Sequence, residues 1–95
     1  MSWQPRRVVW SREAARALGD LSRHDLTQAD TIRDRVRAYA SSGVGDVRKL
    51  AGRSGEYRLR VGSWRGVFAF GADPITGEPA VFVLRIGNRR DIYRS

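Results

Sequence analysis

Hydrophobic positions recur along this chain with two different periods. In the first half the period is about 3.6 residues, which is typical of an amphipathic α-helix, and in the second half it is about 2, which is typical of a strand. A short β-branched and aromatic run at residues 7–10 predicts a first strand. Ser11 then provides an N-cap, and apolar residues follow at helical spacing, at Ala14, Ala15, Leu18 and Leu21. We expect a first helix over about residues 12–21.

A second helix is expected after a break in the segment LSRHDL. Asp25 or Thr27 can cap its first turn, because a short side-chain oxygen accepts a hydrogen bond from an amide that the helix leaves unpaired. Its apolar stripe consists of Ile32, Val36, Tyr39 and Ala40. The glycine-containing segment SSGVGD ends this helix. His24 lies in the break and is predicted to be a surface turn residue.

The second half of the chain predicts three strands. Residues 57–61 alternate apolar and basic side chains, residues 64–70 follow after two residues, and residues 80–87 follow the turn signals of ADPITGEP. The order β, α, α, β, β, β predicts an α+β fold, in which two helices pack on one face of a mainly antiparallel four-stranded sheet. A chain of 95 residues has the length of one domain, which we expect to span residues 1–95.

A two-residue hairpin turn is predicted at Gly62-Ser63, where the glycine supplies the positive φ of a type II′ turn. This turn fixes the register of the two strands that it joins. Val61 lies opposite Trp64, and Arg60 lies opposite Arg65. Directly opposed side chains have Cβ atoms about 5 Å apart, so the second pair brings two like charges together.

Alternation along the strands then divides the side chains between two faces. We expect one face to receive the apolar set and to pack under the helices: Tyr57, Leu59, Val61, Trp64, Phe68 and Phe70. The opposite face receives Arg58, Arg60 and Arg65, and is termed the arginine face. Arg85 is expected to join it, in phase with Val81 and Val83 and opposite to Phe82, Leu84 and Ile86. Four converging guanidinium groups form an arrangement that suits a phosphate.

The overall charge supports a polyanionic partner. The formal net charge is +8, and it comes from 17 arginines and one lysine against ten acidic residues. Residues 48–95 hold ten of the basic residues and four of the acidic ones, so the second half carries most of the positive field. Nucleic acid is the most common polyanion. The alternative is that the arginines only cover an open sheet face with their aliphatic stems and keep their charges in water.

The amino-acid composition excludes several kinds of functional site. Cysteine is absent and histidine occurs once, which excludes disulfide frameworks, Cys/His zinc sites and thiol catalysis. Neither a signal peptide nor an apolar run of the roughly 20 residues needed to span a membrane occurs in the sequence. We therefore expect a soluble protein without a membrane partner, and the absence of cysteine suits the cytoplasm.

Two runs of the sequence, taken together, resemble a known family. KLAGRSGEYRLRVGSWRGVFAF followed by VFVLRIGNRRDIYR, with VVWSREAARALGDL near the start, is similar to the RelE branch of the RelE/ParE toxins of bacterial toxin–antitoxin pairs. The resemblance covers nearly the whole chain. It implies a compact βααβββ toxin that enters the ribosomal decoding site and cleaves mRNA there, without a metal or cofactor. It also implies a cognate antitoxin as partner, beside the ribosome and mRNA.

The resemblance also implies which residues act. Matched motif to motif, the catalytic residues are Arg58 and Arg60 of YRLR, Arg65 of WR, Arg89 of GNRR and the terminal Tyr93. Contacts to RNA or the ribosome are expected from Lys49, Arg53, Arg85, Arg90 and Arg94. Some family members have lysine in place of Arg58 and Arg60, and arginine cannot release its proton as a crowded lysine can. Either Tyr93 then takes the proton, or the arginines act only electrostatically. Asp91 is expected to pair with Arg90 or Arg94.

Three functions remain open on the sequence. The first is a ribosome-dependent mRNA endoribonuclease, which the arginine face favours. The second is a DNA gyrase inhibitor of the ParE kind, which shares the fold and cuts no RNA. The third is a nucleic-acid-binding module without activity, in which the arginines grip the phosphate backbone.

Overall fold

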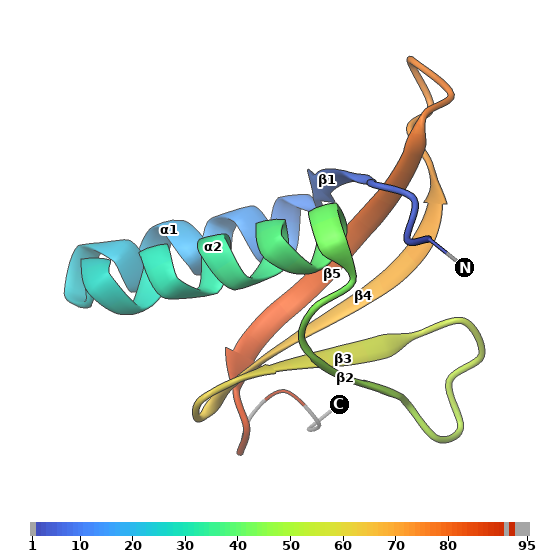
Figure 1. Ribbon diagram of the computed structural model, residues 1–95. Helices are drawn as coiled ribbons and strands as arrows, with labels where there is room; N and C mark the ends of the chain where they lie inside the picture. Colours follow the sequence, from blue (N-terminus) through green and yellow to red (C-terminus); the bar gives the residue numbers. More distant parts are fainter. Residues whose placement is uncertain (1, 91, 93–95) are drawn as a thin grey trace.

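The structure of the protein is a computed structural model, which describes residues 2–90 and 92. Two helices and five strands follow one another along the chain (Figure 1). Their bounds are β1 (Arg7–Trp10), α1 (Arg12–His24), α2 (Leu26–Ser42), β2 (Asp46–Lys49), β3 (Tyr57–Val61), β4 (Trp64–Ala72) and β5 (Pro79–Asn88). The α+β class is therefore confirmed. The four-stranded βααβββ order is wrong, because β2 adds a fifth strand.

A single residue, Asp25, separates the two helices. Helix α1 begins after Ser11, whose Oγ accepts a hydrogen bond from the amide of Ala14 at 3.0 Å. It runs on to His24, three residues beyond the expected end, and the break within LSRHDL is the single residue Asp25. Asp25 rather than Thr27 caps α2, since its Oδ1 accepts from the amide of Gln28 at 3.0 Å. His24 is exposed, as expected, but it is the last residue of a helix.

The C-terminus of α2 is fixed by a glycine and a tryptophan. Gly43 caps the helix with φ at 78°, a left-handed conformation that favours glycine. The indole ring of Trp3 lies against it, and a Cβ at position 43 would meet that ring at 2.6 Å. The indole Nε1 also donates a hydrogen bond to the carbonyl of Ala40 at 3.0 Å. The N-terminal segment is thereby attached to the end of α2.

The five strands form one mixed sheet in the order β1-β5-β4-β3-β2. Strand β1 pairs parallel with β5, and all other neighbours are antiparallel. The helices lie side by side on one face of this sheet, and the β4–β5 turn projects from the body (Figure 1). Between helices and sheet lies the core, which includes Leu18, Ile32, Val36, Leu59 and Phe68. Neither of the two described helices lies on the opposite face.

The β4–β5 turn is held by two carboxylates. Backbone amides of Ile75 and Thr76, and the charge of Arg7, hold the pKa of Asp73 below its ordinary value. A hydrogen bond from Arg7 at 2.6 Å lowers the pKa of Glu78 in the same way. A pKa that is lower in the folded protein contributes stability above its unfolded value, and that stability is lost as the pH falls through the folded value.

We therefore expect the turn to loosen in acid before the rest of the sheet. Its stabilisation is complete above about pH 4, the ordinary range of these carboxyls, and disappears below it. The measurement is amide hydrogen exchange of Gly77, whose amide donates to the carbonyl of Asp73 at 2.8 Å, as a function of pH. Asp73→Asn should exchange fast at every pH. Equal acid sensitivity of Gly77 in the wild type and the variant would contradict the assignment.

Candidate nucleic-acid interface

The β3–β4 hairpin has the register that the sequence predicts. A type II′ turn needs a positive φ at its first central residue only. Gly62 has φ at 62°, and no non-glycine residue described by the structure, Ser63 included, has a positive φ. Gly62-Ser63 therefore follows the pattern of a type II′ turn. Arg60 pairs with Arg65, and Val61 pairs with Trp64. The apolar side chains of β3 point towards the helices, and the arginines point away from them.

Cations from four strands meet on the arginine face. Directly opposed residues share a face of a sheet, and two transverse rows follow from the pairing. One row contains Asp46, Arg60, Arg65 and Gly87; the next contains Arg48, Arg58, Val67 and Arg85. Arg48 belongs to this face although it was not among the expected residues, because its position depends on the unexpected strand β2. The sheet therefore presents five arginines in two adjacent rows.

Arg85 lies on the arginine face because of a β-bulge, and not because it is in phase with Val81 and Val83. The pairing of β4 with β5 shifts between Val67 and Phe68, so that Phe68 pairs with Val83 and Val67 pairs with Arg85. This bulge leaves Leu84 without a partner on β4 and reverses the phase beyond it. Val81, Val83 and Ile86 belong to the core. The expectation that Arg85 is in phase with Val81 and Val83 is therefore wrong.

Arg58 holds an unused hydrogen-bond donor. Its side chain is 16% exposed, and its Nη1 is buried without a hydrogen-bond partner within the part of the chain that the structure describes. The nearest carboxylate oxygen is Oδ1 of Asp46, at 3.7 Å, which is too long for a hydrogen bond. A buried donor without an acceptor costs about 1–3 kcal/mol.

Arg65 is the most deeply placed of these arginines. It is 8% exposed, and its Nη1 donates to the carbonyls of Gly62 at 2.8 Å and Trp64 at 2.9 Å. Part of its guanidinium group thus stabilises the hairpin turn. Arg60, directly opposite, is exposed.

Glu56 was not predicted as a member of the site. Its Oε1 accepts a hydrogen bond from Nη2 of Arg85 at 3.0 Å and lies 3.9 Å from Nη1 of Arg53. The sequence contained the signal that could have found it, since Glu56 has the same parity as Arg58. Its carboxylate holds Arg85 across β4.

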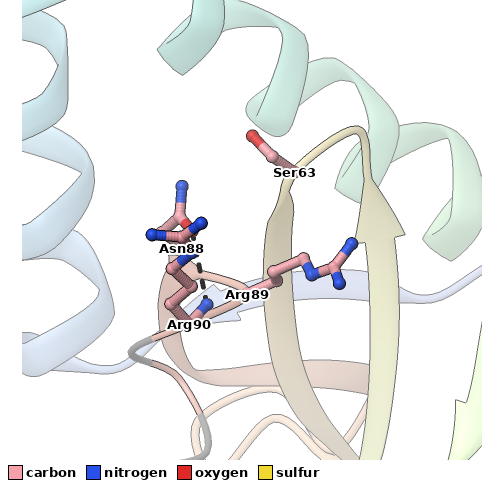
Figure 2. A pocket seen from close by; sticks show the side chains of 4 residues that line it. All are labelled: Ser63, Asn88, Arg89 and Arg90. Carbon is pink, nitrogen blue, oxygen red and sulfur yellow. Dashed lines mark hydrogen bonds between the residues drawn. The ribbon is translucent and has the colours of Figure 1, made fainter.

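A pocket lies where the hairpin turn meets the end of β5 (Figure 2). It is lined by Ser63, Asn88, Arg89 and Arg90. The amide of Arg89 donates to the carbonyl of Ser63 at 2.8 Å, and the amide of Arg90 donates to Oδ1 of Asn88 at 3.3 Å. Arg89 extends towards the hairpin strands, away from Asn88 and Arg90 (Figure 2). Both arginines are exposed, so the pocket offers hydrogen-bond donors to solvent.

The remaining residues that were expected to contact RNA or to act in catalysis do not all lie on the arginine face. Lys49 pairs with Tyr57, so the register puts it on the helix side of the sheet rather than with the arginines. Ile92 is buried, and a Cβ at Gly87 would meet its side chain at 3.3 Å, so Ile92 packs at the arginine face. Tyr93 and Arg94, together with Asp91, lie outside the described residues.

The described residues therefore offer a face of hydrogen-bond donors with two carboxylates in contact with it. Residues 2–90 and 92 contain no group of three or more His, Cys, Asp or Glu side chains that could hold a metal ion. None of the helices in this part of the chain is both long and apolar enough to cross a membrane. The chemistry that this arrangement can perform is the binding of phosphate oxygens and the stabilisation of negative charge.

Comparison with solved structures identifies the fold. The YoeB/ParE toxin from Agrobacterium tumefaciens is 20% identical, with a TM-score of 0.68, over 86% of this chain and 96% of that one. RelBE2, a toxin–antitoxin complex from Mycobacterium tuberculosis, contains a chain that is 21% identical, with a TM-score of 0.65, over 96% of this chain and 100% of its own. The archaeal RelE–RelB complex from Pyrococcus horikoshii gives 19% identity and a TM-score of 0.63, with coverage of 93% and 99%. No family model matches the sequence, and no curated protein matches it.

Proposed function

We propose that this protein, whose fold is that of the RelE/ParE toxins, is the toxin of a type II toxin–antitoxin pair and cleaves mRNA in the decoding site of the ribosome. The observation that carries the proposal is the two adjacent rows of five arginines on the sheet face opposite the two helices. Guanidinium groups held in adjacent rows are suited to the oxygens of a phosphate backbone.

The proposed reaction uses the 2′-OH of the RNA as nucleophile. Its oxygen attacks the adjacent phosphorus in line, and negative charge develops on the phosphoryl oxygens. Arg58, Arg60 and Arg65 stabilise this charge, because fixed donors that point at a developing charge lower the barrier to reaction. Arg89, with Arg90, holds the strand at the pocket beside the hairpin turn. Tyr93 is the residue that the family resemblance places at the reacting oxygens.

The partner that keeps such a protein inactive is a cognate antitoxin. Two of the similar structures are complexes of a RelE-type toxin with its antitoxin. A segment with acidic and apolar residues would be complementary to the arginine face. Its binding would exclude RNA from the same surface.

A gyrase inhibitor of the ParE kind is the second candidate, since one of the similar structures is described as a YoeB/ParE toxin. Brief expression of the chain, followed by mapping of mRNA 5′ ends and a gyrase supercoiling assay, separates the two functions. We expect cuts in phase with codons, which disappear with Arg58→Met. Intact mRNA together with inhibited supercoiling would overturn the proposal, and intact mRNA with active gyrase would favour a binding module.

Ribosome binding should weaken steeply with salt. Each guanidinium–phosphate contact releases about 0.7–0.9 counterions, so contacts from four exposed arginines, Arg48, Arg60, Arg89 and Arg90, give a log–log slope of about −3. The measurement is the dissociation constant at several salt concentrations. Arg60→Ala should make the slope shallower by about one contact. Arg35→Ala, an exposed arginine on α2, is the matched control and should leave it unchanged. A flat response of the wild type would exclude the arginine face as the binding surface.

A further inference from the structure

The place of Arg85 on the arginine face depends on one irregularity in the sheet, the β-bulge at Leu84. Before the bulge, Val83 faces the helices and belongs to the core. If the pairing continued without a bulge, alternation would turn Arg85 to that same side and bury its charge under the helices. The bulge reverses the phase, so that Arg85 pairs with Val67 and joins the other arginines. The group that holds the bulge therefore decides whether Arg85 is available to a ligand.

A single residue, Ser11, satisfies both carbonyls at the bulge. In a regular strand, successive carbonyls point to opposite neighbouring strands. Here the carbonyls of Val83 and Leu84 both accept hydrogen bonds from Ser11, the first from its amide at 2.9 Å and the second from its Oγ at 2.7 Å. Ser11 directly follows β1, the parallel neighbour of β5. The hydroxyl of Ser11 thus provides a donor for Leu84, which the register leaves without a partner on β4.

The same hydroxyl also caps α1. Its Oγ accepts the hydrogen bond from the amide of Ala14 at 3.0 Å while it donates to Leu84. A hydroxyl can do both, because it has one donor and two acceptor lone pairs, whereas an ionised carboxylate can only accept. The helix cap needs the acceptor, and the bulge needs the donor. The two roles of Ser11 can therefore be separated by substitution.

We propose that Ser11 is a positioning residue for the arginine face, because its hydroxyl fixes the bulge that places Arg85 there. The inference rests on the proposed function, in which this face binds RNA. Glu56 holds the other end of Arg85, since its Oε1 accepts from Nη2 at 3.0 Å. Ser11 thus sets the backbone, and Glu56 sets the guanidinium group. Without the donor from Ser11, the strand beyond Leu84 is no longer held in one pairing with β4, and Arg85 spends less time on the arginine face.

Substitutions at position 11 test whether the bulge depends on the hydroxyl. Ser11→Asp keeps the acceptor for the helix cap and removes the donor to the bulge, whereas Ser11→Thr keeps both. Nuclear Overhauser contacts between Val67 and Arg85 should weaken in Ser11→Asp and keep their wild-type strength in Ser11→Thr. Ser11→Ala loses the helix cap as well, and its matched control is Asp25→Ala, which removes the cap of α2. Only Ser11→Ala should weaken these contacts.

Ribosome binding shows whether Ser11 acts through Arg85. Ser11→Asp should raise the dissociation constant about 10-fold, the loss of one charged contact, and Arg85→Ala should have an effect of similar size. The double variant should then bind within about 2-fold of Arg85→Ala alone, because the second change has nothing further to displace. The negative charge that aspartate adds would act in both backgrounds, so it would not produce this non-additivity. A general loss of stability would not produce it either.

Each other outcome has one meaning. If the contacts of Ser11→Asp and Ser11→Ala equal those of the wild type, the bulge does not depend on the hydroxyl, and the assignment is overturned while the proposed function stands. If the effects of Ser11→Asp and Arg85→Ala on ribosome binding add, or if binding is unchanged, Ser11 does not act through Arg85, and the assignment is also overturned. If the wild type does not bind ribosomes, the proposed function itself fails, and the inference fails with it.

Discussion

Arg58→Met is expected to lower mRNA cleavage by about 100-fold or more while leaving the protein at least as stable as the wild type. The two effects have one cause. The buried Nη1 of Arg58 has no acceptor in the described residues, and Arg58 also lies directly opposite Arg48. Methionine keeps the aliphatic contacts and removes the unpaired donor, the like-charge contact and the 3.7 Å ion pair with Asp46. An ion pair of that length to a half-exposed carboxylate contributes little, so the free energy of unfolding should stay level or rise by about 1 kcal/mol.

Urea unfolding and single-turnover cleavage measure the two quantities on the same preparation. Arg35→Met, at an exposed position on α2, is the control and should change neither. A loss of more than about 1 kcal/mol with cleavage retained would mean that Arg58 is a structural residue.

Gly43→Ala is expected to cause the largest loss of stability, about 2–4 kcal/mol. Two costs add at this position. Alanine resists the φ of 78°, and its Cβ would meet the Trp3 ring at 2.6 Å, so the indole must leave the end of α2. That movement also breaks the hydrogen bond to Ala40.

Gly52→Ala separates the two costs. Gly52 has φ at 76°, and a Cβ there would have no neighbour within 4 Å, so only the backbone strain of about 1 kcal/mol remains. Urea unfolding of both variants gives the difference directly. Equal losses would show that the indole of Trp3 can move away without cost, and that the N-terminal segment does not stabilise α2.

The sequence predicts the elements whose signal is local. Strand β1 has the bounds expected from RVVW, and the register of the hairpin follows from Gly62-Ser63, because a two-residue turn leaves one pairing that keeps the apolar residues on one side. Elements that depend on a partner were missed. The segment DVRK has no hydrophobic alternation, and it is the strand β2 because β3 offers it a free edge. The bulge at Leu84 likewise depends on the pairing with β4.

In the candidate site, too, the sequence predicts only the residues whose facing follows from alternation within one strand. Parity along one strand placed Arg58 and Arg60 on a common face, and it could have placed Glu56 there too. Residues on β2 could not be assigned, because their facing depends on pairing. Asp46 was therefore missed, and Lys49 was expected at the RNA although it lies on the helix side. The catalytic and RNA-binding roles stay predictions.

The most direct test of the central claim is a reconstituted reaction with purified ribosomes, an mRNA of known sequence and this protein. We predict cleavage within the codon in the decoding site, with a 2′,3′-cyclic phosphate and a 5′-hydroxyl at the new ends. It should require the ribosome and be lost with Arg58→Met. The contradictory result is an mRNA that stays intact on ribosomes that the protein demonstrably occupies.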